Sequence, residues 1–222
     1  MRITEVYIPI RYFYVKVIII KNIYQFDNKV YFLIDMKLQM FVNRRTTMTG
    51  TIELHTPRLV LRRHVAEDAE ILHRVFGLDE AMYRYSGWNP YATTNLAEET
   101  VQDFISSYSR EDFYGWAIEQ DGQLVGTVGA YDFDPCTKSI EIGLLIRRDR
   151  WGEGLGTEAL SAVLEYLTGP EGIECVHAWC AASNTGSRRV MEKAGMVLTG
   201  TEPEGLEVCG KVYDKLNFEY HG

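Results

Sequence analysis

A glycine-rich segment, residues 151–159, carries the clearest chemical signal in the sequence. It reads Trp-Gly-Glu-Gly-Leu-Gly-Thr-Glu-Ala, with glycine at every second position from 152 to 156. The segment joins a predicted strand to a predicted helix, so its unscreened backbone amides would lie at the positive end of the helix dipole. This arrangement favours binding of a phosphate or pyrophosphate.

The hydrophobic pattern around this segment predicts a mixed α/β fold. Apolar side chains recur at helical spacing in some segments and alternate in others. The order of these segments implies a mixed sheet with helices on both faces. The predicted strands cover residues 54–63, 113–119, 124–132, 140–146 and 175–180 and a final pair between 195 and 220, and the predicted helices cover 65–75, 95–108, 154–167 and 187–193.

Composition excludes several classes of partner. The 222-residue chain has a formal net charge of −8, and so acidic a protein lacks the basic face that nucleic-acid binding needs. No apolar run approaches the roughly 20 residues of a membrane helix. The cysteines at 136, 175, 180 and 209 form neither a Cys-x-x-Cys pair nor a matched spacing with histidine. We therefore expect reduced thiols, no metal site and a cytoplasmic protein.

The first 47 residues differ sharply from the rest. They contain no Gly, Ala, Ser, Cys, His or Trp and hold eight Lys/Arg against three Asp/Glu, whereas all 19 glycines follow residue 47. One interpretation is an extension translated from a misplaced start, with Met48 beginning the real domain, residues 48–222. The other is a cationic, aromatic arm. Because charges interrupt every apolar run, we expect weak or edge-like structure there.

The glycine segment alone admits two other interpretations. Gly154-Leu-Gly156-Thr-Glu-Ala159 fits the G-x-G-x-x-A pattern of dinucleotide-binding folds. However, residues 147–151 separate these glycines from the preceding strand, and Glu174 opens the next strand where an acidic residue should close it. The second interpretation is a structural turn whose glycines allow close packing.

Five motifs spread over residues 54–220 narrow the choice. They are Thr56-Pro-Arg-Leu-Val-Leu-Arg62, Trp116-Ala-Ile118, Ile142-Gly143, the segment 151–159, and Asn184-Thr-Gly-Ser-Arg-Arg-Val-Met-Glu-Lys-Ala-Gly-Met196. Together they resemble the GNAT superfamily of acyl-CoA-dependent N-acetyltransferases, and within it the RimJ/RimL-like branch. The resemblance implies a mixed, mostly antiparallel sheet of about seven strands, splayed between strands 4 and 5.

The resemblance also implies how acetyl-CoA would bind as a co-substrate. The glycine loop would hold the pyrophosphate, with Trp151 where the general pattern has Gln or Arg, and Arg147, Arg148 and Arg150 could pair with the 3′-phosphate. The pantetheine arm would lie in the splay, where Gly143 suits a β-bulge. The implied cofactor-binding residues are Leu144, Ile146, Trp151, Gly152, Glu153, Gly154, Leu155, Gly156, Thr157, Asn184 and Ser187. Asn184 could equally cap the following helix.

For the chemistry, Glu141 is the candidate general base, because glutamates on this strand serve as bases in some GNAT members. Alternation places Glu141, Gly143 and Leu145 on one face of the strand. The backbone amide near Leu145 would stabilise the oxyanion. Many members have a Tyr as general acid where this chain has Met191, so Ser183, Ser187 or water would replace it. Glu141 could also be a solvated strand residue.

The implied acceptor is a primary amine on a small molecule or a peptide. Aromatic residues Tyr85, Trp88 and Tyr91 in the loop after the first helix could hold an ammonium group, or could pack as core. The resemblance selects no particular amine, and a homodimer is compatible with it. The alternative from another class is a coenzyme A-binding regulatory module without catalysis.

Overall fold

The structure is a computed structural model that describes residues 2–10, 13–21, 48–86 and 88–222. The chain divides into two compact units, Met1–Arg45 and Thr46–Gly222. In the first unit, β1 (Arg2–Ile10) and β2 (Phe13–Lys21) pair antiparallel in a two-stranded sheet. Both strands are therefore edge strands of their own small sheet. The expectations for the rest of the first 47 residues lie outside the described residues.

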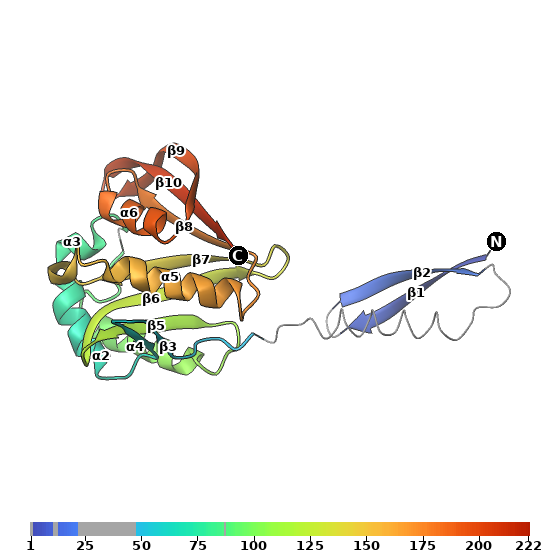
Figure 1. Ribbon diagram of the computed structural model, residues 1–222, viewed down its shortest axis with the longest axis horizontal. Helices are drawn as coiled ribbons and strands as arrows, with labels where there is room; N and C mark the ends of the chain where they lie inside the picture. Colours follow the sequence, from blue (N-terminus) through green and yellow to red (C-terminus); the bar gives the residue numbers. More distant parts are fainter. Residues whose placement is uncertain (1, 11–12, 22–47, 87) are drawn as a thin grey trace. The chain divides into compact units, whose positions relative to one another are not determined.

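An eight-stranded sheet forms the centre of the second unit, in the order β3-β4-β5-β6-β7-β8-β10-β9. Neighbouring strands pair antiparallel except β7 and β8, which are parallel. The predicted mixed, mostly antiparallel sheet is confirmed, and Figure 1 shows its course. The strands are β3 (Leu54–His55), β4 (Val60–Arg62), β5 (Tyr114–Gln120), β6 (Gln123–Asp134), β7 (Ser139–Ile146), β8 (Cys175–Ala181), β9 (Val197–Val208) and β10 (Lys211–His221).

The eighth strand arises because the single strand predicted over residues 54–63 is two. Thr56 closes a tight turn between β3 and β4: its amide donates to the Leu59 carbonyl and its hydroxyl accepts from the Leu59 amide, both at 2.9 Å. Pro57 has no N–H to give to a ladder, which favours a break here. The prediction of one continuous strand was wrong because alternation alone does not detect this turn.

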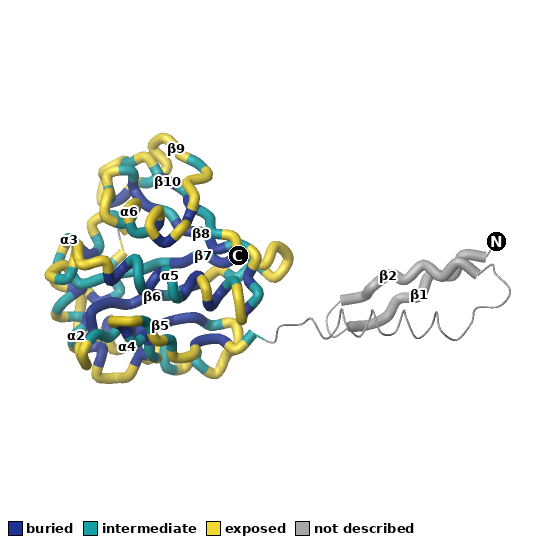
Figure 2. Tube along the Cα trace, viewed as in Figure 1, coloured by how far each residue is buried: buried dark blue, intermediate teal, exposed yellow. Residues whose placement is uncertain are grey.

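Helices cover both faces of the sheet, as predicted. On one face, α5 and α6 pack on a core that includes Trp116, Ile140 and Leu164. On the other, α2, η1 and α4 pack around Phe76 and Val101, and Figure 2 shows the buried strands between these layers. The helices are α2 (Asp68–Ile71), the π-helix η1 (Leu72–Gly77), α3 (Glu80–Tyr83), α4 (Thr94–Ser107), the 3-10 turn η2 (Arg148–Arg150), α5 (Leu155–Thr168) and α6 (Thr185–Lys193).

The central strands β7 and β8 separate after a short contact. Within the described residues they pair at Ser139–Glu141 opposite Cys175–His177, although β7 continues to Ile146 and β8 to Ala181. The predicted splay between the fourth and fifth strands is thus confirmed. The β-bulge expected at Gly143 is absent from the described β6–β7 ladder, which stays in register there and shifts only beyond Tyr131. Separation of β7 from β8 therefore needs no bulge in β7.

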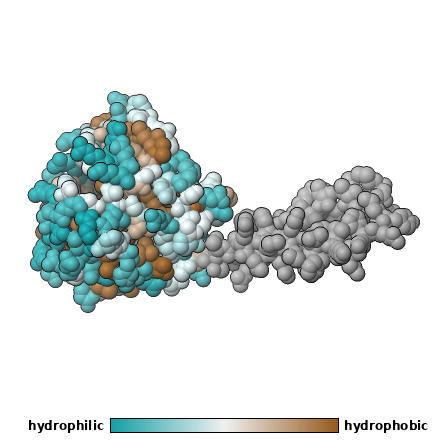
Figure 3. Space-filling model, in the orientation of Figure 1, coloured by the Kyte–Doolittle hydropathy of each residue, from teal (hydrophilic) through white to brown (hydrophobic). Residues whose placement is uncertain are grey.

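None of the helices in the described part of the chain has the length and apolar character needed to cross a membrane. Figure 3 shows brown, apolar residues in separate areas among teal and white ones. Val197 and Val212, on β9 and β10, are 65% and 53% exposed. The homodimer stays a prediction.

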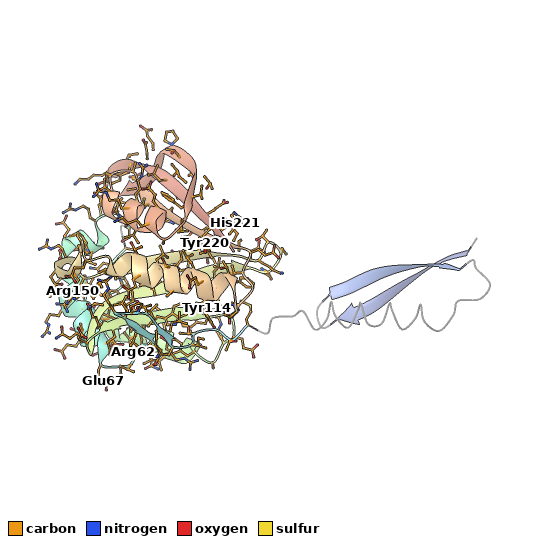
Figure 4. The ribbon with its side chains drawn as sticks, in the orientation of Figure 1. Arg62, Glu67, Tyr114, Arg150, Tyr220 and His221 are labelled. Carbon is orange, nitrogen blue, oxygen red and sulfur yellow. The ribbon has the colours of Figure 1, made fainter. Side chains whose placement is uncertain are left out.

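An ion pair between Arg62 on β4 and Asp68, the first residue of α2, connects this helix to the sheet. The Arg62 guanidinium on β4 donates to both carboxylate oxygens of Asp68, at 2.8 and 2.9 Å, and to Glu119 on β5 at 2.7 Å. Figure 4 shows Arg62 and Glu67, the residue before α2, at the same end of the domain. Burial alone would raise the pKa of Asp68, but hydrogen bonds from Arg62 and the Val65 amide, together with the contact of the His64 ring, outweigh burial and lower it.

We predict that Asp68→Asn removes a pH-dependent part of the stability. A carboxyl whose pKa is lowered on folding stabilises the protein above its unfolded pKa of about 3.9, and this contribution is lost as the pH falls toward the folded pKa. The variant should lose about 3 kcal/mol at pH 7, and the difference should shrink below about pH 4. Urea unfolding from pH 7 to pH 3 measures it. Asp103→Asn, on the exposed side of α4, is the control, and equal behaviour of the two variants would contradict the prediction.

Candidate active site

The glycine loop presents open backbone amides at the start of α5. Gly152 and Gly154 have φ of 84° and 82°, a conformation that side chains with a Cβ rarely adopt. Gly154 is the N-cap of α5, and among the described side chains none caps it. A Cβ added at Gly152 would find no described atom within 4 Å. The loop can therefore receive an anion at the positive end of a 14-residue helix.

Gly156 has a different role from the other two glycines. It is buried in the first turn of α5, and a Cβ there would lie 3.4 Å from side-chain carbons of Leu144, Ile146 and Val190. A side-chain carbon at this distance makes ordinary van der Waals contact, so packing alone does not require glycine at this position. Leu155, beside it, is 1% exposed and belongs to the core. Gly152 and Gly154 thus serve the conformation of the loop, whereas Gly156 lies in the packed first turn of α5.

Polar contacts fix the loop from both sides. The Trp151 indole N–H donates to the Ile146 carbonyl at 2.6 Å, and Arg58 donates to the Glu153 carbonyl at 2.9 Å. Trp151 remains 53% exposed, and the Thr157 side chain is half-buried on α5. The three arginines before the loop each pair with a carboxylate: Arg147 with Asp149, Arg148 with Asp79 and Arg150 with Glu153. A phosphate would have to compete with these partners.

The β6–β7 ladder decides which backbone groups face the splay. The Arg147 amide donates to the Val125 carbonyl at 2.9 Å, and the register continues unbroken back to Leu145. In an antiparallel ladder such hydrogen-bonded pairs recur at every second residue, so the Leu145 amide also points toward β6. The prediction of this amide as oxyanion donor was therefore wrong. The amides of Leu144 and Ile146 face the splay instead.

Glu141 occupies the last paired position of β7 before the splay. One of its carboxylate oxygens accepts from the Tyr131 hydroxyl at 2.9 Å and from the Trp179 indole at 2.8 Å. The carboxylate lines a pocket of about 440 Å³ that also includes His177, Lys215 and Asn217. Burial, followed by the charge and hydrogen bond of Glu141, raises the pKa of Tyr131 above its ordinary range. Tyr131 therefore acts as a hydrogen-bond donor that orients the carboxylate.

Sequence analysis missed Tyr131 and Trp179. Tyr131 pairs with Glu141 across β6 and β7, and Trp179 lies two residues beyond His177, which pairs with Glu141 across β7 and β8. Both contacts follow from strand register. Alternation on each strand indicates a face, but neighbours in the sheet cannot be assigned until the strand order is known.

The start of α6 confirms the capping role of Asn184. Its side-chain oxygen accepts from the Ser187 amide at 3.2 Å. Ser183, just before it, is exposed, and its carbonyl lies 3.5 Å from the Tyr85 hydroxyl. Met191 is 5% exposed and packs in the core. The structure thus places Tyr85, from the loop predicted to bind the acceptor, beside Ser183.

The three aromatic residues predicted for the acceptor separate in the structure. Tyr85 packs edge-on against Tyr213, with 5.6 Å between ring centroids, and Trp88 is 70% exposed. Tyr91 is 4% exposed and packs against Phe76, and its burial raises its pKa to about 12. The prediction that Tyr91 contacts the acceptor was therefore wrong, because this residue belongs to the core under α2 and α4.

Comparison with known proteins gives the family. The model of the acetyltransferase (GNAT) domain matches residues 58–197. The chain belongs to the GNAT family of acetyltransferases. It is 29% identical over 163 residues to the uncharacterized N-acetyltransferase YoaA of Bacillus subtilis (strain 168), covering 72% of this chain and 92% of that protein.

Solved structures agree on the fold. RimL, a ribosomal L7/L12 α-N-protein acetyltransferase solved with coenzyme A, superposes with a TM-score of 0.70 at 18% identity, over 77% of this chain and 98% of RimL. Mycobacterium smegmatis RimJ, solved with a CoA-disulfide, gives 0.66 at 22% identity, over 74% and 82% of the two chains. The chain is thus a GNAT acetyltransferase, as its motifs predicted, and it shares the fold of RimL and RimJ.

We predict that Gly152→Ala weakens acetyl-CoA binding at least tenfold, because its methyl group covers amides of the loop. Gly122→Ala is a matched control: Gly122 has φ of 74° in the β5–β6 turn and equally open surroundings. Both variants should lose about 1 kcal/mol of stability through strain at positive φ. Calorimetric titration with acetyl-CoA should therefore distinguish them, and equal affinities would show that the loop amides do not bind the co-substrate.

Proposed function

We propose that this chain transfers the acetyl group of acetyl-CoA to a primary amine, on a peptide or a small molecule. The observation that carries the proposal is Glu141, a carboxylate oriented by two hydrogen bonds at the point where β7 and β8 separate. It lines an open pocket that can receive an acceptor. The candidate base Glu141, the opening between β7 and β8, and the glycine loop that follows β7 therefore all lie along one strand and its continuation.

The residues present fit acetyl-CoA. The amides of residues 152–157 would hold the pyrophosphate. The splay leaves the Leu144 backbone groups and the Ile146 amide to bind an extended chain as a neighbouring strand would, while the Ile146 carbonyl accepts from the Trp151 indole. When bound, acetyl-CoA supplies an acetyl group activated as a thioester. An amide of Leu144 or Ile146 would then stabilise negative charge that develops on the acetyl oxygen.

Glu141 would accept the proton that the amine must lose. A lysine-type amine has a pKa of about 10.4 and an α-amine about 8, so both are mostly protonated at neutral pH. The Tyr131 and Trp179 hydrogen bonds leave the second carboxylate oxygen of Glu141 available to the acceptor, directly or through water. Ser183, exposed before α6, is the candidate donor of a proton to the departing thiolate, and Ser187 or water can replace it.

The acceptor would approach through the pocket beside β8 and β10. Tyr85 lies near Ser183, and Trp88 offers an exposed aromatic face from the same loop. An aromatic face and carboxylates together suit an ammonium group. Because RimL is named for acetylating the α-amine of a ribosomal protein, a peptide N-terminus is the first acceptor to assay.

Thermal unfolding of the full chain should show acetyl-CoA and coenzyme A stabilising the protein and NADH leaving it unchanged. A ligand at 100 times its dissociation constant adds about 2.7 kcal/mol, a rise in Tm of roughly 5 to 10 °C for a domain of this size. Stabilisation by NADH would instead favour the dinucleotide interpretation. If neither acetyl-CoA nor coenzyme A shifts the Tm, the glycine loop is structural and the proposal fails.

We predict that Glu141→Gln lowers kcat by about 100- to 1,000-fold without changing the affinity for acetyl-CoA, since the variant keeps the shape of the side chain but cannot accept the proton. Thiol release with a panel of peptide and polyamine acceptors measures kcat, and calorimetry measures acetyl-CoA binding. Glu174→Gln, an exposed carboxylate paired with Lys138, is the control. Unchanged turnover would remove Glu141 from the mechanism, and binding without turnover in the wild type would support a coenzyme A-binding regulatory module.

A further inference from the structure

Four side chains with metal-binding chemistry lie together on β8 and β10. Cys175 and His177 alternate along β8, and Glu219 and His221 alternate along β10. The antiparallel register places Cys175 opposite His221 and His177 opposite Glu219. Residues two apart on a strand point to the same face, so all four side chains project from one face of the two strands. His221, labelled in Figure 4, marks this end of the sheet.

The four side chains form a ring of close contacts, in which each has a ligand atom within 3.8 Å of two of the others. The Cys175 sulfur lies 3.8 Å from His177 Nδ1 and 3.8 Å from His221 Nε2. The Glu219 carboxylate lies 3.2 Å from His221 Nε2 and 3.7 Å from His177 Nδ1. For zinc bonds of 2.0 to 2.3 Å, tetrahedral geometry separates neighbouring ligand atoms by roughly 3.3 to 3.7 Å. The ligand atoms of Cys175, Glu219 and His221 all lie within 4.8 Å of one another.

We propose that Cys175, His177, Glu219 and His221 bind one Zn²⁺ ion. Thiolate, imidazole and carboxylate together suit zinc, whereas magnesium and calcium prefer oxygen ligands alone. Two neutral histidines, one thiolate and one carboxylate balance the charge of Zn²⁺. Binding would break the S–H bond of Cys175, form a Zn–S bond and release one proton to solvent.

The exposure of the cluster allows an ion to reach it. His177 and His221 are 42% and 65% exposed, which gives an ion direct access from solvent.

The site lies beside the proposed catalytic carboxylate, because His177 and Glu219 line the same pocket as Glu141. Glu141 pairs with His177 across β7 and β8, but its carboxylate is held by Tyr131 and Trp179. Zinc would join β8 to β10 along Cys175–His177, the segment of β8 that also pairs with β7. The proposal therefore does not depend on acetyl transfer.

Zinc titration of the full chain, after removal of metal with a chelator, tests the proposal. We expect one tight equivalent of Zn²⁺, and a rise in Tm of roughly 5 to 10 °C when free zinc reaches 100 times its dissociation constant. Co²⁺ in place of zinc should give a thiolate-to-cobalt charge-transfer band and the intense visible absorption of a tetrahedral site. Cys175→Ser and His221→Ala should each weaken zinc binding at least about 100-fold.

Matched controls make the result specific to this cluster. Cys136→Ser removes another exposed cysteine and His55→Ala another exposed histidine, and both should bind zinc like the wild type. Absence of zinc binding by the wild type overturns the proposal. So does zinc binding that persists unchanged in Cys175→Ser and His221→Ala, or a cobalt complex without a thiolate band. Since none of these readouts uses acetyl-CoA, failure here is distinguishable from failure of the proposed activity.

Discussion

The separation of β7 from β8 is the constraint on which the rest of the domain depends. Three residue pairs hold the strands together, and beyond Glu141 each keeps its other neighbour: β7 stays on β6, and β8 stays on β10. A central pair of strands that paired fully would leave neither an opening for a co-substrate nor free backbone groups to bind it.

The same separation explains where the chemical groups lie. Glu141 is the last residue of β7 fixed by strands on both sides, so its backbone is held rigidly beside an opening that begins one residue later. Sites built on paired strands hold side chains more precisely than sites on loops. Tyr131 from β6 and Trp179 from β8 add hydrogen bonds from both neighbouring strands. The carboxylate is therefore positioned by the sheet itself.

Local sequence patterns predicted the elements, the glycine loop and the face that carries Glu141, because each depends on residues close in the chain. They failed where the outcome depends on a neighbour distant in sequence. The direction of the Leu145 amide follows from the β6–β7 register, and the burial of Tyr91 follows from packing beside Phe76. The proximity of Cys175, His177, Glu219 and His221 was missed for the same reason, since the spacing rules for metal ligands compare positions along one chain segment.

The pairing of β8 with β7 and β10, which the sequence does not reveal, also links the candidate active site at Glu141 to the proposed zinc site. His177 is the sheet partner of Glu141 on one side and of Glu219 on the other. Trp179, which orients the Glu141 carboxylate, is two residues farther along the same strand and on the same face. A cation that fixed β8 to β10 at His177 would limit the freedom of β8 where it supplies this hydrogen bond. Metal binding and placement of the base would then be coupled through one strand, with no need for a change elsewhere in the fold.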